Sequence, residues 1–509
     1  MKRSVRILLL LTVPTLLQAQ APQGQEAPVV TLGLEEALAQ ARNYNPEYRQ
    51  QLNNLSTANT QVRSAYGSLL PGASVSAGMD YTGSGQTNFG QGFTRSTSAV
   101  VGSSYSAGFY WDIDGTRLLA PSIEKSNREA VSQEISSEEA RLRFLISDQY
   151  LTAAAAGAEV TVAREQVLRN QTFLDLASAR YRVGQGTLIE VRQAEVQKAQ
   201  ADVDLLRTVY LEKDAKLELF RRIGVAPPVP VEQIALSDSF PVTPVGVGLD
   251  QVLQEAEDFN PQLKALRARQ QGAATNVKSA RTEYLPSLSL RGGWSGFTQE
   301  QTDKDLLLSQ SQAAALGGAS SCLTQDSVRV GAGLAPIAPT PSTCYTALGL
   351  DPTTQQLTSQ TQNAILDANN QFPFNFTNAP FGASLSISLP IFSGFSRQLR
   401  VQQAREFQQD ADESVRAQQL LVRSGVTSRY LAWETAYEAI AVQAAGRDAA
   451  RDQVRLAQDR YRLGTGTALE VSDAQIAVRR AEGDYIAAVY EYHRALAALE
   501  AAVGRPLSQ

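Results

Sequence analysis

The strongest constraint on this chain is a twelve-residue segment that occurs twice. Residues 180–191 read RYRVGQGTLIEV, and residues 460–471 read RYRLGTGTALEV, which is the same segment 280 positions later with eight of twelve residues identical. Gly184 and Gly464 suit the C-terminus of a helix, because glycine adopts positive φ without strain. In both copies a threonine followed three residues later by glutamate predicts a capping box that begins another helix. We therefore expect two helix–turn–helix hairpins in a duplicated chain.

The duplication extends well beyond these two hairpin tips. An Asn-Pro and a Leu-Pro dipeptide in the first half recur 215 residues later, so that their prolines are Pro46, Pro71, Pro261 and Pro286. We expect the helix that opens each half to run through its Asn-Pro dipeptide. A proline-rich segment, 227–248, separates the halves and predicts an irregular linker. The mature chain is thus divided into a first repeat, 22–226, and a second repeat, 249–509.

Each repeat contains two stretches in which apolar residues alternate with glycine and serine. In the first repeat they predict a β-hairpin over 71–112 with a loop at 83–98, and in the second they predict strands at 286–296 and 380–392. Strands of about ten residues with this alternation are typical of outer-membrane proteins. A soluble hairpin with one buried face explains the first two strands equally well.

The first 21 residues have the pattern of a signal peptide. Lys2, Arg3 and Arg6 precede a short apolar stretch, and Ala19 and Ala21 provide small residues for cleavage after either position. Export from the cytoplasm would permit a disulfide between Cys322 and Cys344, the two cysteines of the chain.

Composition argues against several classes of function. The formal net charge is −5 and is spread along the chain, so nothing indicates a nucleic-acid partner. One histidine and two methionines are too few for a metal pathway built from these residues. We find no phosphate loop, nucleophile–base set or metal-ligand cluster in the sequence. We therefore expect no enzyme activity, no cofactor and no metal site.

Four short strands cannot close a barrel, and an open sheet edge is not tolerated in lipid. Two copies of the chain would supply eight strands and a filled interior, whereas three would supply twelve and leave room for a pore. The long helical segments, at about 90 Å for 60 residues, would extend such a barrel into a tunnel.

The doubled strand–helix–tip order, the Asn-Pro and Leu-Pro sites and both tips resemble the TolC family of outer-membrane efflux proteins over nearly the whole mature chain. The resemblance implies an α+β membrane protein that forms a homotrimer, with a 12-stranded barrel in the outer membrane and a helical barrel in the periplasm. Its implied partners are outer-membrane lipid, a periplasmic adaptor protein and an inner-membrane RND, ABC or MFS transporter. It would export small molecules or secreted proteins. The alternative is a structural or adhesin-like coiled-coil protein that spans the envelope without transport.

The resemblance also places candidate functional residues at the tips. It puts a periplasmic gate at Tyr461, Glu470, Asp473 and Glu190. The family often has a basic or polar residue where this chain has Gly466, so we expect Arg462, Arg182 or Arg192 to help hold the gate closed. Capping alone also explains Glu190 and Glu470, whereas Asp473 has no such local role. The adaptor-contact candidates, which a tight helix turn would equally require, are Gly184, Gly186, Thr187, Gly464, Gly466 and Thr467.

The segment 297–379 is an insert relative to the first repeat, because across it the offset between the halves grows from 215 to 279. It contains both cysteines. One hypothesis is a disulfide-stapled cap or lid over the outer mouth of the barrel. The other is a disordered or protective surface loop.

Overall fold

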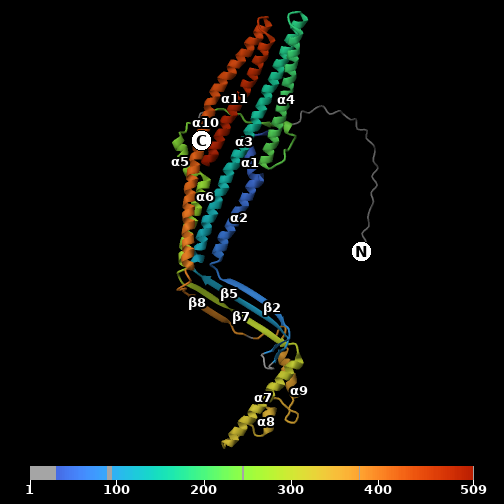
Figure 1. Ribbon diagram of the computed structural model, residues 1–509, viewed down its shortest axis with the longest axis vertical. Coiled ribbons are helices and arrows are strands. Elements are labelled where there is room, and N and C mark those ends of the chain that lie inside the picture. The colour runs from blue at the N-terminus through green and yellow to red at the C-terminus, as the bar shows by residue number, and fades with distance from the viewer. Residues whose placement is uncertain (1–29, 89–93, 243–245, 378, 508–509) are drawn as a thin grey trace, which may run out of the picture. The chain divides into compact units, whose positions relative to one another are not determined.

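The computed structural model describes residues 30–88, 94–242, 246–377 and 379–507 (Figure 1). The predicted signal peptide, 1–21, lies outside them. The described residues form two compact units, of which unit 1 lies within 30–58, 127–270 and 410–507 and unit 2 within 59–126 and 271–409. No helix among the described residues is both long and apolar enough to cross a membrane.

Unit 1 is built from helices that repeat in the two halves of the chain. Hairpin α3/α4 and hairpin α10/α11 lie side by side with their tips at the same end (Figure 1). The helices that lie wholly or partly in unit 1 are α1 (Leu34–Tyr44), α2 (Pro46–Gly67), α3 (Gly115–Arg182), α4 (Leu188–Ile223), α5 (Leu249–Phe259), α6 (Pro261–Thr282), α10 (Ser396–Arg462) and α11 (Ala468–Val503).

The prediction of one continuous helix through each Asn-Pro dipeptide is wrong. α1 ends before Asn45 and α5 ends before Asn260, and both asparagines have extended backbone angles. The reason is steric, because proline disfavours a helical conformation in the residue before it. The proline then occupies the first position of the next helix, where its missing N–H costs nothing.

Two apolar clusters pack the helices of unit 1. One joins α1, α3 and α4 through residues such as Ile146, Tyr150 and Phe220. The other joins α5, α10 and α11 around Trp433 and Tyr492. The linker 227–248 is more regular than predicted. It contains the 3-10 helix Val231–Gln233 and strand β6 (Ile234–Leu236), which pairs in parallel with β1 (Val30–Leu32).

Unit 2 contains a four-stranded antiparallel sheet in the order β2-β5-β7-β8 (Figure 1). Its strands are β2 (Gly72–Thr82), β5 (Val100–Ile113), β7 (Ser287–Gln301) and β8 (Gly382–Ser388). β7 is longer than predicted and β8 is shorter. The predicted loop at 83–98 is wrong in part, because β3 (Gly85–Asn88) and β4 (Thr94–Thr97) pair within it.

The register of the sheet separates two kinds of side chain. Val75, Ala107 and Trp294 are opposite one another on one face, whereas Ser76, Ser106 and Ser295 are opposite one another on the other. Because side chains alternate along a strand, one face is apolar and the other is lined with serine and glycine.

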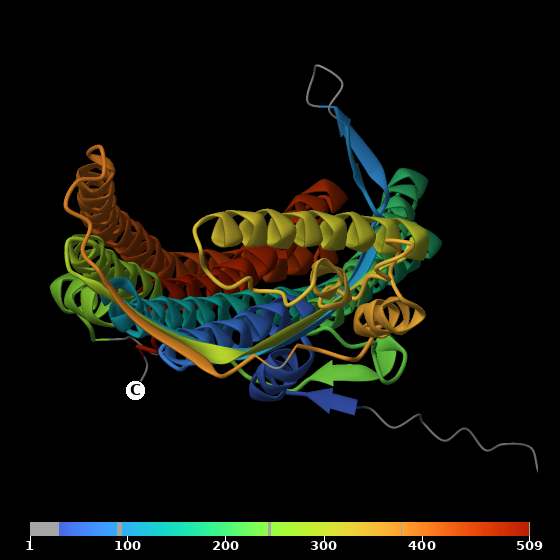
Figure 2. The same cartoon turned by 90° about the horizontal axis from the view of Figure 1, so that it is seen from below.

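The interpretation of the insert as a disordered loop is wrong. It contains α7 (Lys304–Gly331), α8 (Pro341–Thr346) and α9 (Ser359–Asn369), and α8 and α9 pack against α7 (Figure 2). Asp303 caps α7 by accepting a hydrogen bond from the Leu306 N–H at 2.9 Å. A small core around Ala319, Leu350 and Leu357 holds the three helices together.

Candidate gate at the helical tips

The two tip loops have the same backbone geometry. Gly184 and Gly464 both have φ of 76°, where a side chain would be strained. At Gly466 an added Cβ would lie 2.9 Å from the Cβ of Arg460 and 3.1 Å from the backbone nitrogen of Tyr461. Gly186 is similarly crowded, by the Cβ of Arg180 at 3.2 Å. The chain folds back so closely over each helix end that a side chain at Gly186 or Gly466 would be crowded, more so at Gly466.

The helices that leave the tips begin with threonine caps. Thr187 forms the complete predicted capping box with Glu190, in which each residue's side chain accepts a hydrogen bond from the other's backbone N–H. Thr467 accepts from the Glu470 N–H at 3.2 Å. The carboxylate of Glu470 lies instead 3.7 Å from the guanidinium of Arg460. The second capping box is therefore only half formed.

Tyr461 joins the two hairpins. Its side chain is 1% exposed and packs against the ring of Phe173 on α3. Its hydroxyl donates a hydrogen bond to Glu190 on α4 at 3.1 Å. Burial, together with the nearby Glu190 carboxylate, raises the pKa of Tyr461 to about 12. The neutral phenol therefore remains a donor to Glu190 at any physiological pH.

Arg180 adds two further contacts to Tyr461, and sequence reasoning missed it. Its guanidinium lies 4.6 Å from the centroid of the Tyr461 ring, and it donates a hydrogen bond to the Tyr461 carbonyl. It also donates to the carbonyl of Gln185 in its own tip loop at 3.1 Å. The equivalent Arg460 donates to the carbonyl of Thr465. The duplicated motif marks Arg180 and Arg460 as equivalent, but it carries no signal that Arg180 reaches across to Tyr461.

The arginines expected to hold the gate closed have other surroundings. Arg462 lies 3.7 Å from Asp459 on its own helix, and Arg192 pairs with Glu195 at 2.7 Å. Arg182 is exposed. Among the tip arginines of the described chain, Arg180 is thus the one whose guanidinium bridges the hairpins at Tyr461.

Glu470 and Asp473 line the same hollow beside the second tip, as expected for residues one helical turn apart. The hollow has a volume of about 640 Å³ and is formed by α10 and α11. Both acidic side chains are accessible to solvent. Asp452 adds a third carboxylate and Arg460 a positive charge, and the remaining lining residues are Ala449, Gln453, Leu456 and Ala457.

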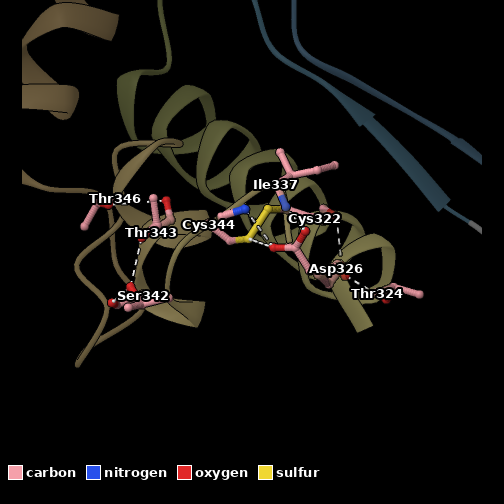
Figure 3. The surroundings of a disulfide bond; sticks show 12 residues. Cys322, Thr324, Asp326, Ile337, Ser342, Thr343, Cys344 and Thr346 are labelled. Atoms are coloured by element: carbon pink, nitrogen blue, oxygen red, sulfur yellow. Dashed lines mark hydrogen bonds between the residues drawn. A yellow bond between two sulfur atoms is a disulfide. The ribbon is translucent and has the colours of Figure 1, made fainter. Parts of the chain in front are cut away.

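Cys322 and Cys344 lie within the insert, outside the tip region. They form a disulfide between α7 and α8 with their Cα atoms 5.9 Å apart (Figure 3). Beside them the carboxylate of Asp326 accepts hydrogen bonds from the backbone N–H groups of Ile337 and Ala338, at 2.5 and 3.0 Å. The disulfide and Asp326 together fasten the loop after α7 to that helix. Because the sulfur atoms of Cys322 and Cys344 are bonded to each other, the cluster of these two residues and Asp326 has no thiolate to offer a metal ion.

Several solved structures share the fold of this chain at low sequence identity. Solved structures with a similar fold include VceC from Vibrio cholerae, at 16% identity and TM-score 0.64 over 93% of this chain and 97% of that one. The CmeC outer membrane channel of Campylobacter jejuni is 14% identical, with TM-score 0.65 over 94% and 87%. The MtrE outer membrane channel of Neisseria gonorrhoeae, in its open state, is 18% identical, with TM-score 0.61 over 96% and 94%.

Curated proteins provide no match to the chain. The family described as Outer membrane efflux protein matches residues 37–225 and 352–505, which is more than half of the sequence and includes both tips. The chain therefore belongs to the Outer membrane efflux protein family, whose members are outer-membrane channels with a periplasmic helical extension and not enzymes.

Proposed function

We propose that this protein is a homotrimeric outer-membrane duct with a closable periplasmic end. It exports small molecules or secreted proteins delivered by an inner-membrane RND, ABC or MFS transporter through a periplasmic adaptor. The observation that carries the proposal is the set of contacts from Glu190 and Arg180 to Tyr461, because it joins the tips of the two hairpins by side chains that motion could separate.

The sheet supports assembly from several copies. In the sheet of the described residues β2 and β8 each have a neighbour on one side only, and every residue of β8 is exposed. An unpaired edge in lipid is costly, since its N–H and C=O groups have no partner. Pairing β8 of one copy with β2 of the next removes all such edges when the ring closes. Three copies give twelve strands, with the serine and glycine face around the pore.

The helices support the same assembly. Along α4 an exposed apolar residue occurs every seven positions, at Ile189, Val196, Val203, Tyr210 and Leu217. Along α10 Val442 and Leu456 are exposed at twice this spacing. A seven-residue apolar repeat is the pattern of a coiled-coil seam. We infer that α4 of one copy packs against α10 of the next.

In a trimer Glu470 and Asp473 contribute six carboxylates around one axis. These carboxylates are accessible and lie beside the gate contacts, so they would attract cations to the constriction. The gate then combines a steric closure at Tyr461 with an acidic ring. Its residues are Tyr461, Glu190, Glu470 and Asp473, and Arg180 takes the bridging role that the sequence left open among Arg462, Arg182 and Arg192.

The tips also suit the proposed adaptor. Val183, Leu463 and Leu469 are 62–78% exposed around the two turns. Apolar side chains exposed at the end of paired helices fit the apolar face of a helical partner. Gly184, Gly186, Thr187, Gly464, Gly466 and Thr467 would shape this surface by keeping the turns narrow.

The test is single-channel conductance in a planar bilayer, with the wild type compared with a variant that carries Asp473→Ala and Glu470→Gln. The glutamine side chain in place of Glu470 keeps hydrogen-bonding capacity while removing the charge. We expect a small, cation-preferring conductance in the wild type, and a larger, less selective one in the variant. Arg480→Gln, an exposed change on the same helix, is the control for altered surface charge.

Absence of conductance from folded trimers of either protein would favour the non-transporting structural role or a pore blocked by the insert. Removal of 304–368, which deletes α7 and α8 and most of α9, separates these two outcomes. Conductance that appears after the deletion would identify the insert as a lid. Continued absence of conductance would contradict the proposed duct.

A further inference from the structure

A buried ion-pair cluster connects the two hairpins well away from the tips. The side chain of Glu482 on α11 is 3% exposed. One of its carboxylate oxygens lies 2.9 Å from Arg169 on α3, and the other lies 3.0 Å from Arg451 on α10. Glu482 therefore connects three helices, and both of its oxygens have a positively charged partner. It lies roughly 21 Å along α11 from the tip, at 1.5 Å per residue.

Arg169 is itself held in place. Arg169 also donates to the side-chain oxygen of Gln166, at 3.1 and 3.2 Å, and lies 3.4 Å from Glu165. Its guanidinium is thus fixed on α3 before it reaches across to Glu482. Glu482 is buried, whereas Arg169 and Arg451 are 23% and 51% exposed. Separating the helices would remove the partners of the buried carboxylate, and the cluster therefore resists this separation.

Between this cluster and the tip, half of the twelve buried residues of the apolar cluster shared by the hairpins are alanines, and its two large rings, Phe173 and Tyr461, form the gate contact itself. The buried residues there include Ala177, Ala194, Ala457 and Ala474. Gln475 is 1% exposed, and neither atom of its side-chain amide has a hydrogen-bond partner among the described residues. A buried amide without partners is costly. This stretch is therefore held less firmly than its burial suggests.

Beyond the cluster, away from the tip, the packing is different. Trp433 on α10 and Tyr492 on α11 contact each other and are both buried with Val252 and Ala256 of α5. Large interlocking side chains resist sliding, because a displaced ring would leave a cavity. The cluster thus lies at the boundary between a firmly packed and a weakly held part of the same helices.

We propose that Glu482, with Arg169 and Arg451, is the fulcrum of gate opening. The segment of α10 and α11 between the cluster and the tip moves when the Tyr461 contacts break, and the segment beyond the cluster stays in place. Glu482 is a positioning residue that acts through the arrangement of the helices. This inference rests on the proposed gating function. It adds to that proposal the length of α10 and α11 that moves when the gate opens.

Hydrogen exchange measured by mass spectrometry on the full chain in detergent tests this boundary without a transport assay. In the wild type we expect amides in 468–481 to exchange at least tenfold faster than those in 483–499. In Glu482→Gln the fast exchange should extend into 483–492. Asp484→Asn, which removes an exposed charge on the same helix, should leave the boundary where it is.

Arg451→Gln provides a second variant that keeps the Glu482 contact with Arg169, and it should shift the boundary less far. The proposal is overturned if the wild type shows no step at 482. It is also overturned if both variants keep the wild-type profile, or if Glu482→Gln accelerates exchange throughout α11. A boundary at residue 482 in a protein that stays without conductance after removal of 304–368 would refute the duct and, with it, the gating role of Glu482, and would leave only a boundary in helix stability. A conducting protein without this boundary would refute the role of Glu482 and leave the duct intact.

Discussion

Asn45 and Asn260 make the same pair of hydrogen bonds in the two repeats. The side-chain oxygen of Asn45 accepts from the Tyr48 N–H at 2.9 Å, and its amide donates to the Arg222 carbonyl at 2.8 Å. For Asn260 the partners are the Leu263 N–H at 3.0 Å and the Ala502 carbonyl at 2.9 Å. One side chain thus caps the start of a helix and satisfies a carbonyl near the end of another. The two repeats therefore share this pair of hydrogen bonds as well as their sequence motifs.

Asn260→Ala should therefore destabilise unit 1 by about 2 kcal/mol, through loss of the cap and exposure of an unpaired carbonyl. Asn45→Ala should have an effect of similar size. Chemical unfolding of the detergent-solubilised protein, followed by circular dichroism, measures both. Asn53→Ala on the exposed face of α2 is the control. An effect of Asn260→Ala no larger than that of the control would show that water replaces both bonds.

Tyr461→Phe should favour the open gate. The change removes the hydrogen bond to Glu190 and keeps the ring that Arg180 and Phe173 contact. A hydrogen bond to a charged group contributes about 1.5–3 kcal/mol, which corresponds to roughly a 10- to 100-fold shift in the ratio of open to closed channels. Open probability in a planar bilayer is the measurement.

Tyr181→Phe is the matched control, because Tyr181 is the equivalent residue of the first repeat and is 46% exposed. Arg180→Ala should act in the same direction as Tyr461→Phe. An unchanged open probability in both gate variants would mean that these contacts do not hold the channel closed.

The sequence was sufficient for much of this architecture. The alternation of small and apolar residues predicts β2, β5, β7 and β8, because a two-residue period admits no other regular structure. The repeated motif predicts both tips, since glycine and threonine have strong local preferences there. The breaks at Asn45 and Asn260 were missed, although a proline that follows directly should have signalled them.

The gate was less accessible to sequence reasoning. Tyr461 and Glu190 were nominated by family resemblance, and their contact spans 271 positions of the chain. Arg180, Arg182, Arg192 and Arg462 are all arginines near a tip, and local preference does not distinguish them. Which one reaches Tyr461 depends on how the hairpins pack, and no local pattern contains that information.

Gly466→Ala should destabilise the second tip. The new methyl group would be too close to Arg460 and to the backbone of Tyr461, and the backbone cannot easily move away. We expect a loss of about 1–3 kcal/mol, the usual cost of overpacking. Gly446→Ala in α10 has open space around it and should instead stabilise the helix by about 0.5–1 kcal/mol. Thermal unfolding compares the two, and equal shifts would contradict the crowding argument.

Cys322→Ser should loosen the insert and leave the sheet intact. The disulfide closes a loop with a sequence separation of 22 residues. In the chain-entropy model such a loop contributes about 3 kcal/mol to the stability of its region. Limited proteolysis of oxidised protein, reduced protein and the variant should show faster cleavage within 304–369 when the bond is absent. Ser320→Ala is the control. Equal protease sensitivity would show that Asp326 and the small core hold the insert without the disulfide.

His493, the one histidine in the chain, should make stability depend on pH. Its Nε2 lies 3.2 Å from the carbonyl oxygen of Phe240, and its ring contacts those of Phe240 and Tyr492. Burial lowers the pKa of His493 below its usual value of 6.5, although the Phe240 carbonyl partly offsets this effect. The folded state therefore binds a proton at this site less readily than the unfolded state does.

It follows that the stability contributed by neutral His493 is present above pH 6.5 and is lost as pH falls through 6.5 toward the lowered pKa. The denaturant concentration at the unfolding midpoint of the wild type should decrease as the pH is lowered from about 7.5 to 5. Ordinary carboxylates remain ionised over this range. His493→Gln has no titrating ring and should remove this dependence while keeping a donor for the Phe240 carbonyl. A variant that retains the full pH dependence would assign it to other groups and would show that His493 binds protons equally in the folded and unfolded states.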